Sequence, residues 1–338
     1  MSQPAPEVSP AHLFDTINSF HRTAAIKAAI ELEIFTAIAE GNSTAQAIAS
    51  RCGTAERGAR ILCDYLVIIG FLTKENGKYG LTPDSAVFLD RRAPTYVGRA
   101  VEFLLTPTLT SGFEDLAAAV RKGGTTLPDQ GSVTPDHPVW VKFAQAMAPL
   151  MSLPAQLIAD AVPTDPNRDV KVLDIAAGHG IFGIAFAQRN PRLHVTGLDW
   201  PNVLEVAKGN AQAAGIGNRY TTLPGSAFDV DFGTDYDVIL LTNFLHHFDP
   251  PTCEKVISKV HSALREGGRA VTLEFIPNDD RVSPPGSAAF SLIMLGTTPS
   301  GDAYTFSDLE GMFRRSGFTR SEFRPLAPTM QQLVVSYK

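Results

Sequence analysis

The sequence predicts an α/β protein in which a seven-stranded, mostly parallel sheet flanked by helices follows a smaller, mainly helical domain. Two observations carry this prediction. After about residue 168, short apolar segments alternate with helical segments, which is the pattern of a parallel sheet with helices on both faces. Before about residue 100, Ala, Ile and Leu recur at helical spacing, and a short hairpin follows them.

The first domain, residues 1–100, is expected to be a winged helix. Small and apolar residues at helical spacing predict its first helices: Ala24, Ala28, Ile34 and Ile38. Ser43 or Thr44 can cap a further short helix, which Gly53 ends. Asn76-Gly77 between two short apolar segments is a strong hairpin signal. The order of helix, turn, helix and hairpin is typical of a winged helix.

Two further regions follow. Residues 101–165 predict a helical connector that contains a loop rich in Gly, Pro and Thr, from Gly123 to Pro138. Residues 166–338 predict the sheet, with strands at Val170–Ile175, Leu193–Asp199, Arg219–Leu223, Tyr236–Leu241, Arg269–Phe275, Thr319–Phe323 and Gln332–Tyr337. Since no helix separates the last two strands, we expect a terminal hairpin with one antiparallel strand.

Composition narrows the function classes. A total of 29 Lys and Arg against 35 Asp and Glu gives a net charge of -6, which disfavours a protein that grips nucleic-acid phosphates. Cys52, Cys63 and Cys253 have no metal-ligand or disulfide spacing. No apolar run approaches the ~18 residues of a membrane helix, and the first ten residues lack a signal-peptide pattern. We therefore expect a cytoplasmic protein with neither a metal nor a membrane partner.

A glycine-rich loop follows the first expected strand of the sheet. Gly178, Gly180 and Gly183 spell G-x-G-x-x-G, and Asp199 lies 21 residues after Gly178, at the end of the next strand. Glycines let the backbone approach a ligand closely, and an acidic residue there accepts hydrogen bonds from ribose hydroxyls. The pattern predicts a nucleoside cofactor, and NAD(P), with an oxidoreductase function, stays open on spacing alone.

Three features favour S-adenosylmethionine over NAD. Asp174 lies inside the strand just before the loop, where a carboxylate can reach an ammonium group, which NAD lacks. Leu264–Arg269 resembles the L-K-P-G-G turn before the fifth strand of class I methyltransferases. Seven strands that end in a hairpin also match that Rossmann-like fold.

With these motifs in order, residues 170–338 resemble a class I methyltransferase domain, and residues 11–100 resemble the winged-helix dimerisation domain of small-molecule O-methyltransferases. That family includes plant caffeate and flavonoid enzymes, hydroxyindole enzymes and bacterial relatives. The resemblance implies S-adenosylmethionine as cofactor, S-adenosylhomocysteine as product, a small-molecule substrate and a homodimer formed through the N-terminal domain. A winged-helix regulator with a cofactor-sensing domain stays open, although residues 1–100 contain ten basic and ten acidic side chains.

The resemblance also implies a cofactor site. The glycine loop would lie under the methionine part, Asp199 would hold the ribose, and Ser226 replaces the acid that contacts the adenine. The residues that the resemblance places at the cofactor are Asp174, Gly178, Gly180, Asp199, Trp200, Ser226, Ala227, Phe228 and Thr242.

His246 corresponds to the family's catalytic histidine and is the candidate general base. A packing role for this Leu-His-His segment stays open. Glu274 corresponds to one of two carboxylates that support the base, and Ala303 stands where the family has the other, beside Asp302. A hydroxyl is the expected acceptor. Because the supporting constellation is weakened, a thiol, which needs no strong base, stays the alternative.

Two apolar stripes are similar to the walls of the family's substrate pocket. They suit a flat or lipophilic acceptor, although ordinary core packing explains each residue taken alone. With one tyrosine, the substrate-binding residues we expect are Trp140, Phe143, Met147, Phe290, Met294 and Tyr304.

Overall fold

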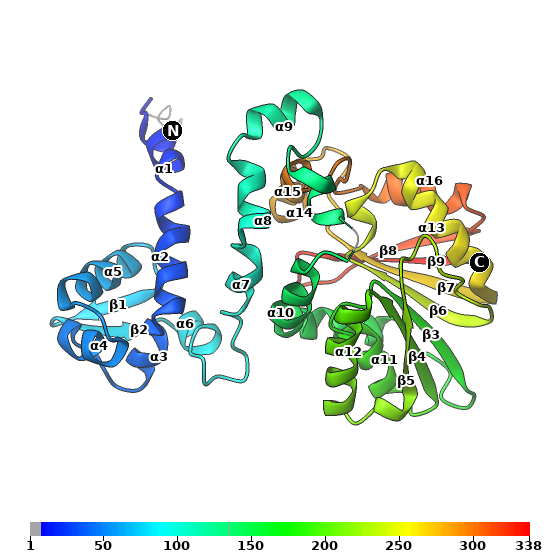
Figure 1. Cartoon of the computed structure of the whole chain (residues 1–338), viewed down its shortest axis with the longest axis horizontal. Coiled ribbons are helices and arrows are strands. Elements are labelled where there is room, and N and C mark those ends of the chain that lie inside the picture. Colours follow the sequence, from blue (N-terminus) through cyan, green and yellow to red (C-terminus); the bar gives the residue numbers. More distant parts are fainter. Residues whose placement is uncertain (1–7, 135) are drawn as a thin grey trace, which may run out of the picture. The chain divides into compact units, whose positions relative to one another are not determined.

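The computed structural model describes residues 8–134 and 136–338, and the chain folds into two compact units (Figure 1). The first unit ends at Val101 and the second begins at Glu102. Residues 102–165, which the sequence sets apart as a connector, therefore belong to the same unit as the sheet. No helix in the described residues has the length and apolarity needed to cross a membrane.

The first unit has the expected winged-helix order. Its elements are α1 (Ala11–Ile17), α2 (Phe20–Glu31), α3 (Ile34–Ala39), α4 (Ala45–Cys52), α5 (Glu56–Ile68), β1 (Leu72–Glu75), β2 (Lys78–Leu81) and α6 (Pro83–Phe88). The Thr44 side chain accepts a hydrogen bond from the Ala47 amide and caps α4, and Gly53 ends that helix in the left-handed conformation. Asn76 and Gly77, both with positive φ, turn the predicted hairpin between β1 and β2.

Helical spacing predicted a helix at α2 but not which of its faces is buried. Ala25 and Ala29 are buried, whereas Ala24 is exposed and Ala28 is half-buried. The spacing is the same on either face, so periodicity alone could not choose between them. Ile34 and Ile38 lie in helix α3, as their spacing predicted, and both are buried.

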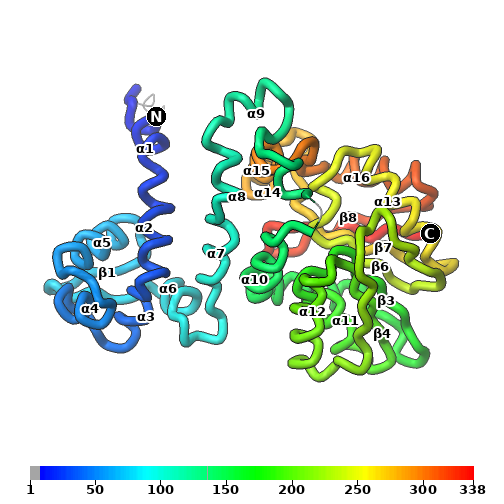
Figure 2. The backbone as a smooth tube through the Cα atoms, in the orientation of Figure 1, coloured from blue at the N-terminus to red at the C-terminus, as the bar shows by residue number. Residues whose placement is uncertain are grey.

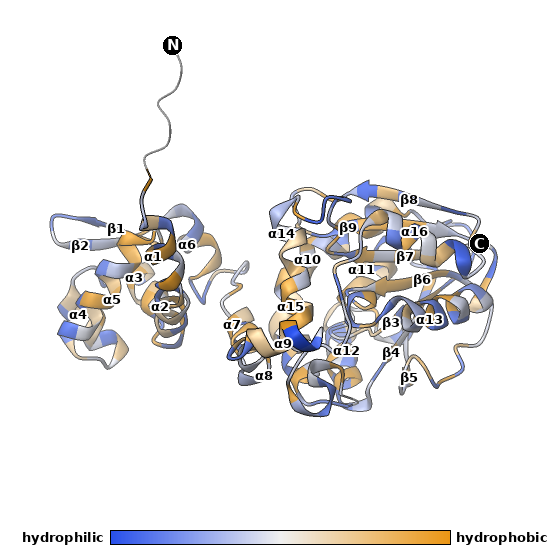
Figure 3. Ribbon diagram, turned by 90° about the horizontal axis from the view of Figure 1, so that it is seen from above, coloured by the Kyte–Doolittle hydropathy of each residue, from blue (hydrophilic) through white to orange (hydrophobic). Residues whose placement is uncertain are grey.

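Helix α1 buries no side chain within the first unit. Apolar side chains on α1 and at the start of α2 are more than half exposed: Leu13, Phe14, Ile17 and Phe20. Figure 3 shows apolar colouring on α1. This unit therefore presents an apolar face that its own residues do not cover.

The second unit contains the sheet. Its helices are α8 (Pro107–Thr110), α9 (Leu116–Lys122), α10 (Val139–Ala161), α11 (Ile181–Arg189), α12 (Pro201–Ala213), α13 (Pro250–Ala263), α14 (Pro285–Ala288), α15 (Phe290–Thr297) and α16 (Phe306–Arg315); α7 (Ala100–Leu104) spans the boundary between the units. Its strands are β3 (Val170–Ile175), β4 (Leu193–Asp199), β5 (Tyr220–Pro224), β6 (Tyr236–Thr242), β7 (Leu264–Glu274), β8 (Arg320–Pro325) and β9 (Gln332–Tyr337).

The strand order is β5-β4-β3-β6-β7-β9-β8, with β9 antiparallel to both of its neighbours. The predicted terminal hairpin is therefore confirmed. Strand β7 begins at Leu264 rather than at the predicted Arg269. The residues of the glycine turn continue its pairing with β6 through an irregularity between Tyr236 and Val238.

Helices cover both faces of the sheet (Figure 1). Helices α10, α11 and α12 pack together on one face, and α13 packs against α16 on the other. Every residue of β6 is buried, as expected for a central strand of a parallel sheet. The carboxyl ends of β3, β4, β6 and β7 meet at one edge, and the backbone trace in Figure 2 shows the loops that leave it. In open α/β sheets this edge is where ligands bind.

The connector loop holds the end of α15. The Thr125 hydroxyl donates to the Gly296 carbonyl at 2.6 Å, and the Thr125 amide donates to the Thr298 carbonyl at 2.8 Å. The Ser132 hydroxyl donates to the Thr297 carbonyl at 3.1 Å. These bonds satisfy carbonyls that the end of a helix leaves free, and they fix the position of α15 beside the carboxyl edge of the sheet.

Candidate active site

The glycine loop turns sharply between β3 and α11. Gly178 and Gly180 both have positive φ, and Gly180 is the residue just before α11. Ala176 also has a positive φ, 54°. This conformation is less favourable for a residue with a Cβ than for glycine. Hydrogen bonds from the Ala177 amide to the Leu198 carbonyl and from the Gly180 amide to the Ala177 carbonyl hold this turn.

Two carboxylates hold the loop. Asp199 accepts hydrogen bonds from the Gly178 amide at 2.8 Å and the Trp200 amide at 2.7 Å. Asp174 is fully buried; its Oδ2 accepts from the Gly183 amide at 3.1 Å, and its Oδ1 has no partner among the described protein atoms. Burial raises the pKa of Asp174 to about 7 and that of Asp199 to about 6.

No basic side chain in the described residues pairs with either carboxylate. Arg189 and Arg192, which are close in sequence, pair instead with Asp160 and Asp169. The loop is therefore an anionic site. It suits a cationic ligand, and it would repel the pyrophosphate of a dinucleotide.

An aromatic wall from α10 covers the loop. The Phe143 ring lies 3.4 Å from the place where a Cβ on Gly178 would be, which is van der Waals contact distance. Phe143 stacks on His179, with ring centroids 5.9 Å apart, and meets Trp140 edge-on at 5.7 Å. The structure thus brings two of the predicted substrate residues to the predicted cofactor loop.

The predicted adenine segment forms a turn after β5. The Ser226 hydroxyl accepts a hydrogen bond from the Phe228 amide at 3.1 Å, and Phe228 packs edge-on against Phe248 at 5.0 Å. Lys259 donates to the carbonyls of Ala227, Phe228 and Val230 at 2.8–3.0 Å. Lys259 was not predicted from the sequence, although a lysine at helical spacing from the buried Val256 and Ala263 was a usable signal.

His246 is paired with Glu274 in a buried site. Its Nδ1 lies 2.5 Å from Glu274 Oε2, and both side chains are at most 6% exposed. The other carboxylate oxygen, Oε1, accepts hydrogen bonds from the Phe244 amide at 3.0 Å and the Leu245 amide at 2.8 Å. Glu274 therefore accepts the Nδ1 proton of His246 and leaves Nε2 as the proton acceptor.

Among the described residues, Glu274 is the carboxylate that pairs with the His246 side chain, and no second one supports it. Ala303 is fully buried, and Asp302 pairs with Arg281 at 3.2 Å. Tyr304 lies in the hydrophobic core, where its hydroxyl donates to the Phe248 carbonyl at 2.5 Å. Since that hydroxyl is already bonded, Tyr304 is less suited to bind a substrate than the sequence suggests.

The remaining predicted residues lie around the same edge of the sheet. Phe290 meets the His246 ring edge-on at 4.8 Å, and Met147 and Met294 are buried. Thr242 is buried at the end of β6. His247 contacts Trp140 edge-on at 5.4 Å, and burial holds its pKa well below the ordinary value. Aromatic contacts thus connect the glycine loop to His246 through Phe143, Trp140 and His247.

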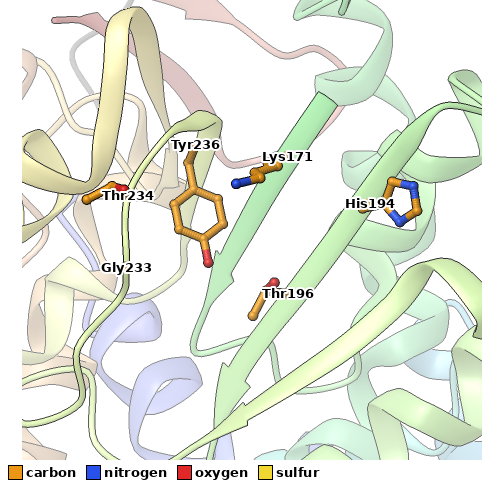
Figure 4. Close-up of a pocket in the computed structure, with 6 residues that line it drawn as sticks. All are labelled: Lys171, His194, Thr196, Gly233, Thr234 and Tyr236. Carbon is orange, nitrogen blue, oxygen red and sulfur yellow. The ribbon is translucent and has the colours of Figure 1, made fainter. Parts of the chain in front are cut away.

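A surface groove of about 440 Å³ lies elsewhere on the sheet (Figure 4). Lys171, His194 and Tyr236, which line it, stand at or near the first residues of β3, β4 and β6. The groove is therefore at the amino ends of the strands, opposite the edge that carries Asp199 and His246.

Comparison with known proteins decides the family. The profile of the O-methyltransferase domain matches residues 113–319, and the profile of the O-methyltransferase dimerisation domain matches residues 14–91. The chain belongs to the O-methyltransferase family. The predicted family and fold class are confirmed, and the protein is a methyltransferase.

Several known proteins are similar to this methyltransferase over nearly its whole length. The solved structure of a Nostoc punctiforme protein assigned to the O-methyltransferases is 56% identical, with a TM-score of 0.95, over 98% of this chain and 100% of that chain. The 3-hydroxy-5-methyl-1-naphthoate 3-O-methyltransferase of Streptomyces sahachiroi is 28% identical over 91% of this chain and 89% of that protein. Human N-acetylserotonin methyltransferase, solved with SAM, shares the fold: TM-score 0.83, 21% identity, 100% and 99% of the chains covered.

Proposed function

We propose that this enzyme transfers a methyl group from S-adenosylmethionine to a hydroxyl group of a small aromatic molecule, with His246 as general base. The observation that carries the proposal is the buried pair of His246 and Glu274 at the carboxyl edge of the sheet. A series of ring-to-ring contacts connects this pair to the anionic glycine loop.

The loop fits the cofactor. Each oxygen of Asp199 accepts one backbone hydrogen bond and keeps a lone pair for a ribose hydroxyl. The unpartnered Oδ1 of Asp174 can accept a charge-assisted bond from the ammonium group. When bound, the cofactor supplies an electrophilic methyl group on a sulfonium. Asp174, Asp199 and the backbone of Gly178 would hold it.

The base acts through an oriented imidazole. Nε2 of His246 takes the proton of the acceptor hydroxyl as that oxygen becomes a nucleophile. Glu274 holds the correct tautomer and stabilises the imidazolium that forms. Because Phe244 and Leu245 amides fix the carboxylate, this orientation costs no rearrangement during the reaction. The intact pair favours a hydroxyl over the alternative thiol acceptor, which needs no such base.

The aromatic acceptor is supported by the walls of the site. The Trp140 ring contacts His247 and the Phe290 ring contacts His246, while the Phe143 ring contacts Trp140. The Streptomyces sahachiroi relative is named for the methylation of a hydroxynaphthoate. We further propose a homodimer formed through the first unit, which matches the dimerisation domain, and a cytoplasmic location.

Methyl transfer from labelled S-adenosylmethionine to a panel of phenols and thiols tests this function. We expect methyl ethers of aromatic hydroxyls as products. His246→Ala should lower the turnover of the best acceptor about 10²- to 10⁴-fold and leave cofactor binding unchanged. An unimpaired His246→Ala enzyme would remove the base assignment, and exclusive methylation of thiols would replace the acceptor class.

A further inference from the structure

Three neighbouring strands place Tyr220, Gly197 and Asp174 in a row beneath the glycine loop. Asp174 on β3 is paired in register with Gly197 on β4, so the side-chain positions of both point to the same face of the sheet. The Tyr220 side chain on β5 reaches across to Gly197, and its hydroxyl occupies the space where a Cβ on Gly197 would be. The missing side chain at Gly197 is what lets the hydroxyl approach Asp174.

The same hydroxyl touches the underside of the loop. It lies 2.9 Å from the place where a Cβ on Gly180 would be, just before α11. Asp174 Oδ2 meanwhile accepts from the Gly183 amide in the first turn of that helix. Tyr220 and Asp174 therefore flank the start of α11, which the glycine loop leads into.

Two oxygens of this row lack a partner. The Tyr220 hydroxyl and Asp174 Oδ1 are buried, and neither has a hydrogen-bond partner among the described protein atoms. A buried polar group left unpaired destabilises the folded state, so native structures rarely leave two together. Because the hydroxyl takes the place of the Gly197 side chain, it lies roughly one strand spacing, about 5 Å, from the Cβ of Asp174 on the neighbouring strand. At this spacing one water molecule can bond to both oxygens.

We propose that Tyr220 is a positioning residue that hydrogen-bonds Asp174 through one buried water and keeps Asp174 in the ionised form that binds the cofactor. This inference rests on the proposed function, because the ligand is the cofactor's ammonium group. Tyr220 touches no reacting atom; it acts through Asp174.

The charges around the pair explain why such a donor is needed. Burial, and then the charges of Asp174 and Asp199, raise the pKa of the Tyr220 hydroxyl, so it stays a proton donor. Asp199 also raises the pKa of Asp174. On the loop itself, burial lowers the pKa of His179 to about 4, so that imidazole is neutral. Among these groups only hydrogen bonds, from Tyr220 and Gly183, favour the ionised carboxylate.

Calorimetric titration of the full-length protein with S-adenosylhomocysteine from pH 6 to pH 8.5 tests the inference. The product keeps the ammonium group. In Tyr220→Phe we expect the pKa of Asp174 to rise by about one unit, because the carboxylate loses a hydrogen bond. Binding should then be about tenfold weaker near pH 6.5, where less of Asp174 is ionised. Near pH 8.5 the affinity should be that of the wild type. The matched control is Tyr236→Phe, which removes a tyrosine hydroxyl from the groove at the opposite edge of the sheet and should bind as the wild type does (Figure 4).

Asp174→Asn removes the titrating group and keeps the inference falsifiable if Tyr220→Phe is poorly stable. In the Asp174→Asn background, the additional Tyr220→Phe change should not alter the pH dependence of binding. An unchanged binding curve in Tyr220→Phe, or an equal loss at every pH, would overturn the inference and leave the proposed function intact. Failure of the wild type to bind would instead contradict the proposed function.

Discussion

Glu274 is the residue whose geometry is most completely determined. Its two oxygens receive two backbone amides and one imidazole, all inside the protein. A glutamine in its place has one oxygen and one NH₂ group. It can serve either the two amides or the Nδ1 proton, but not both.

We therefore expect Glu274→Gln to lower turnover about 10²- to 10⁴-fold, because His246 would lose its tautomer and its counter-charge. The Michaelis constant for the cofactor should change little. Glu266→Gln, at an exposed carboxylate on the same strand, is the matched control and should keep wild-type turnover. Full activity of Glu274→Gln would show that His246 is a packing residue.

The carboxylates of the loop give a second prediction at this scale. In the unfolded chain both carboxyl groups lose their protons near the ordinary pKa of 3.8. In the folded protein the pKa of Asp174 is about 7 and that of Asp199 is about 6. Their contribution to stability is therefore greatest below pH 4 and is lost as the pH rises through 6 and 7. A bound cation favours the ionised forms and reverses this effect.

Cofactor binding should thus release about one proton near pH 6.5 and almost none near pH 8.5, and affinity should rise with pH between them. Calorimetry in buffers of different ionisation enthalpy measures the number of protons released. Proton uptake at pH 6.5, or affinity that falls as the pH rises, would contradict the anionic character of the loop.

At the scale of elements, the connector loop is the feature that fixes α15. Gly131 has φ +64°, and a Cβ there would overlap the Thr297 carbonyl oxygen. Gly123 has φ +80° with open space around it. An alanine at Gly123 therefore introduces backbone strain alone, whereas an alanine at Gly131 also disturbs the contact with α15.

Gly123→Ala should lower the free energy of unfolding by about 1–2 kcal/mol, the cost of left-handed backbone. Gly131→Ala adds an overlap with α15 and should cost about 1–3 kcal/mol more. It should also raise the Michaelis constant of the aromatic acceptor, since α15 carries Phe290. Urea unfolding and steady-state kinetics of both variants provide the comparison; equal unfolding free energies would mean that the loop does not hold α15.

Much of the sheet could be predicted from sequence. Val170–Ile175, Leu193–Asp199 and Gln332–Tyr337 coincide with β3, β4 and β9, because each is an apolar run bounded by turn residues. The start of β7 could not be predicted, since its extra pairing depends on a partner strand. In the same way, the role of Tyr220 depends on a glycine on the neighbouring strand, which no local pattern reveals.

The site shows the same division. The glycine loop and Asp199 follow from a motif with fixed spacing, and His246 and Glu274 follow from the resemblance to the family. Lys259, which ties three carbonyls of the adenine segment, and Asp302, which pairs with Arg281 rather than with His246, depend on tertiary contacts. Spacing places a residue near an edge of the sheet, but only packing decides which atom it meets.

At the scale of the whole molecule, the uncovered apolar face of α1 predicts self-association. Phe14→Asp combined with Phe20→Asp should shift the protein from dimer to monomer at micromolar concentration, because two charges would be placed in an apolar interface. Sedimentation velocity measures the change. Lys27→Asp, an exposed position on α2, is the control; a wild-type monomer would contradict the prediction.

Binding of S-adenosylmethionine at the glycine loop is the property on which the proposed function depends most, and one calorimetric experiment tests it directly. The purified protein is titrated at pH 8 with S-adenosylmethionine, S-adenosylhomocysteine and NAD. The two carboxylates of an anionic loop predict that the first two bind and that NAD does not. Binding of NAD without binding of S-adenosylmethionine would contradict the account.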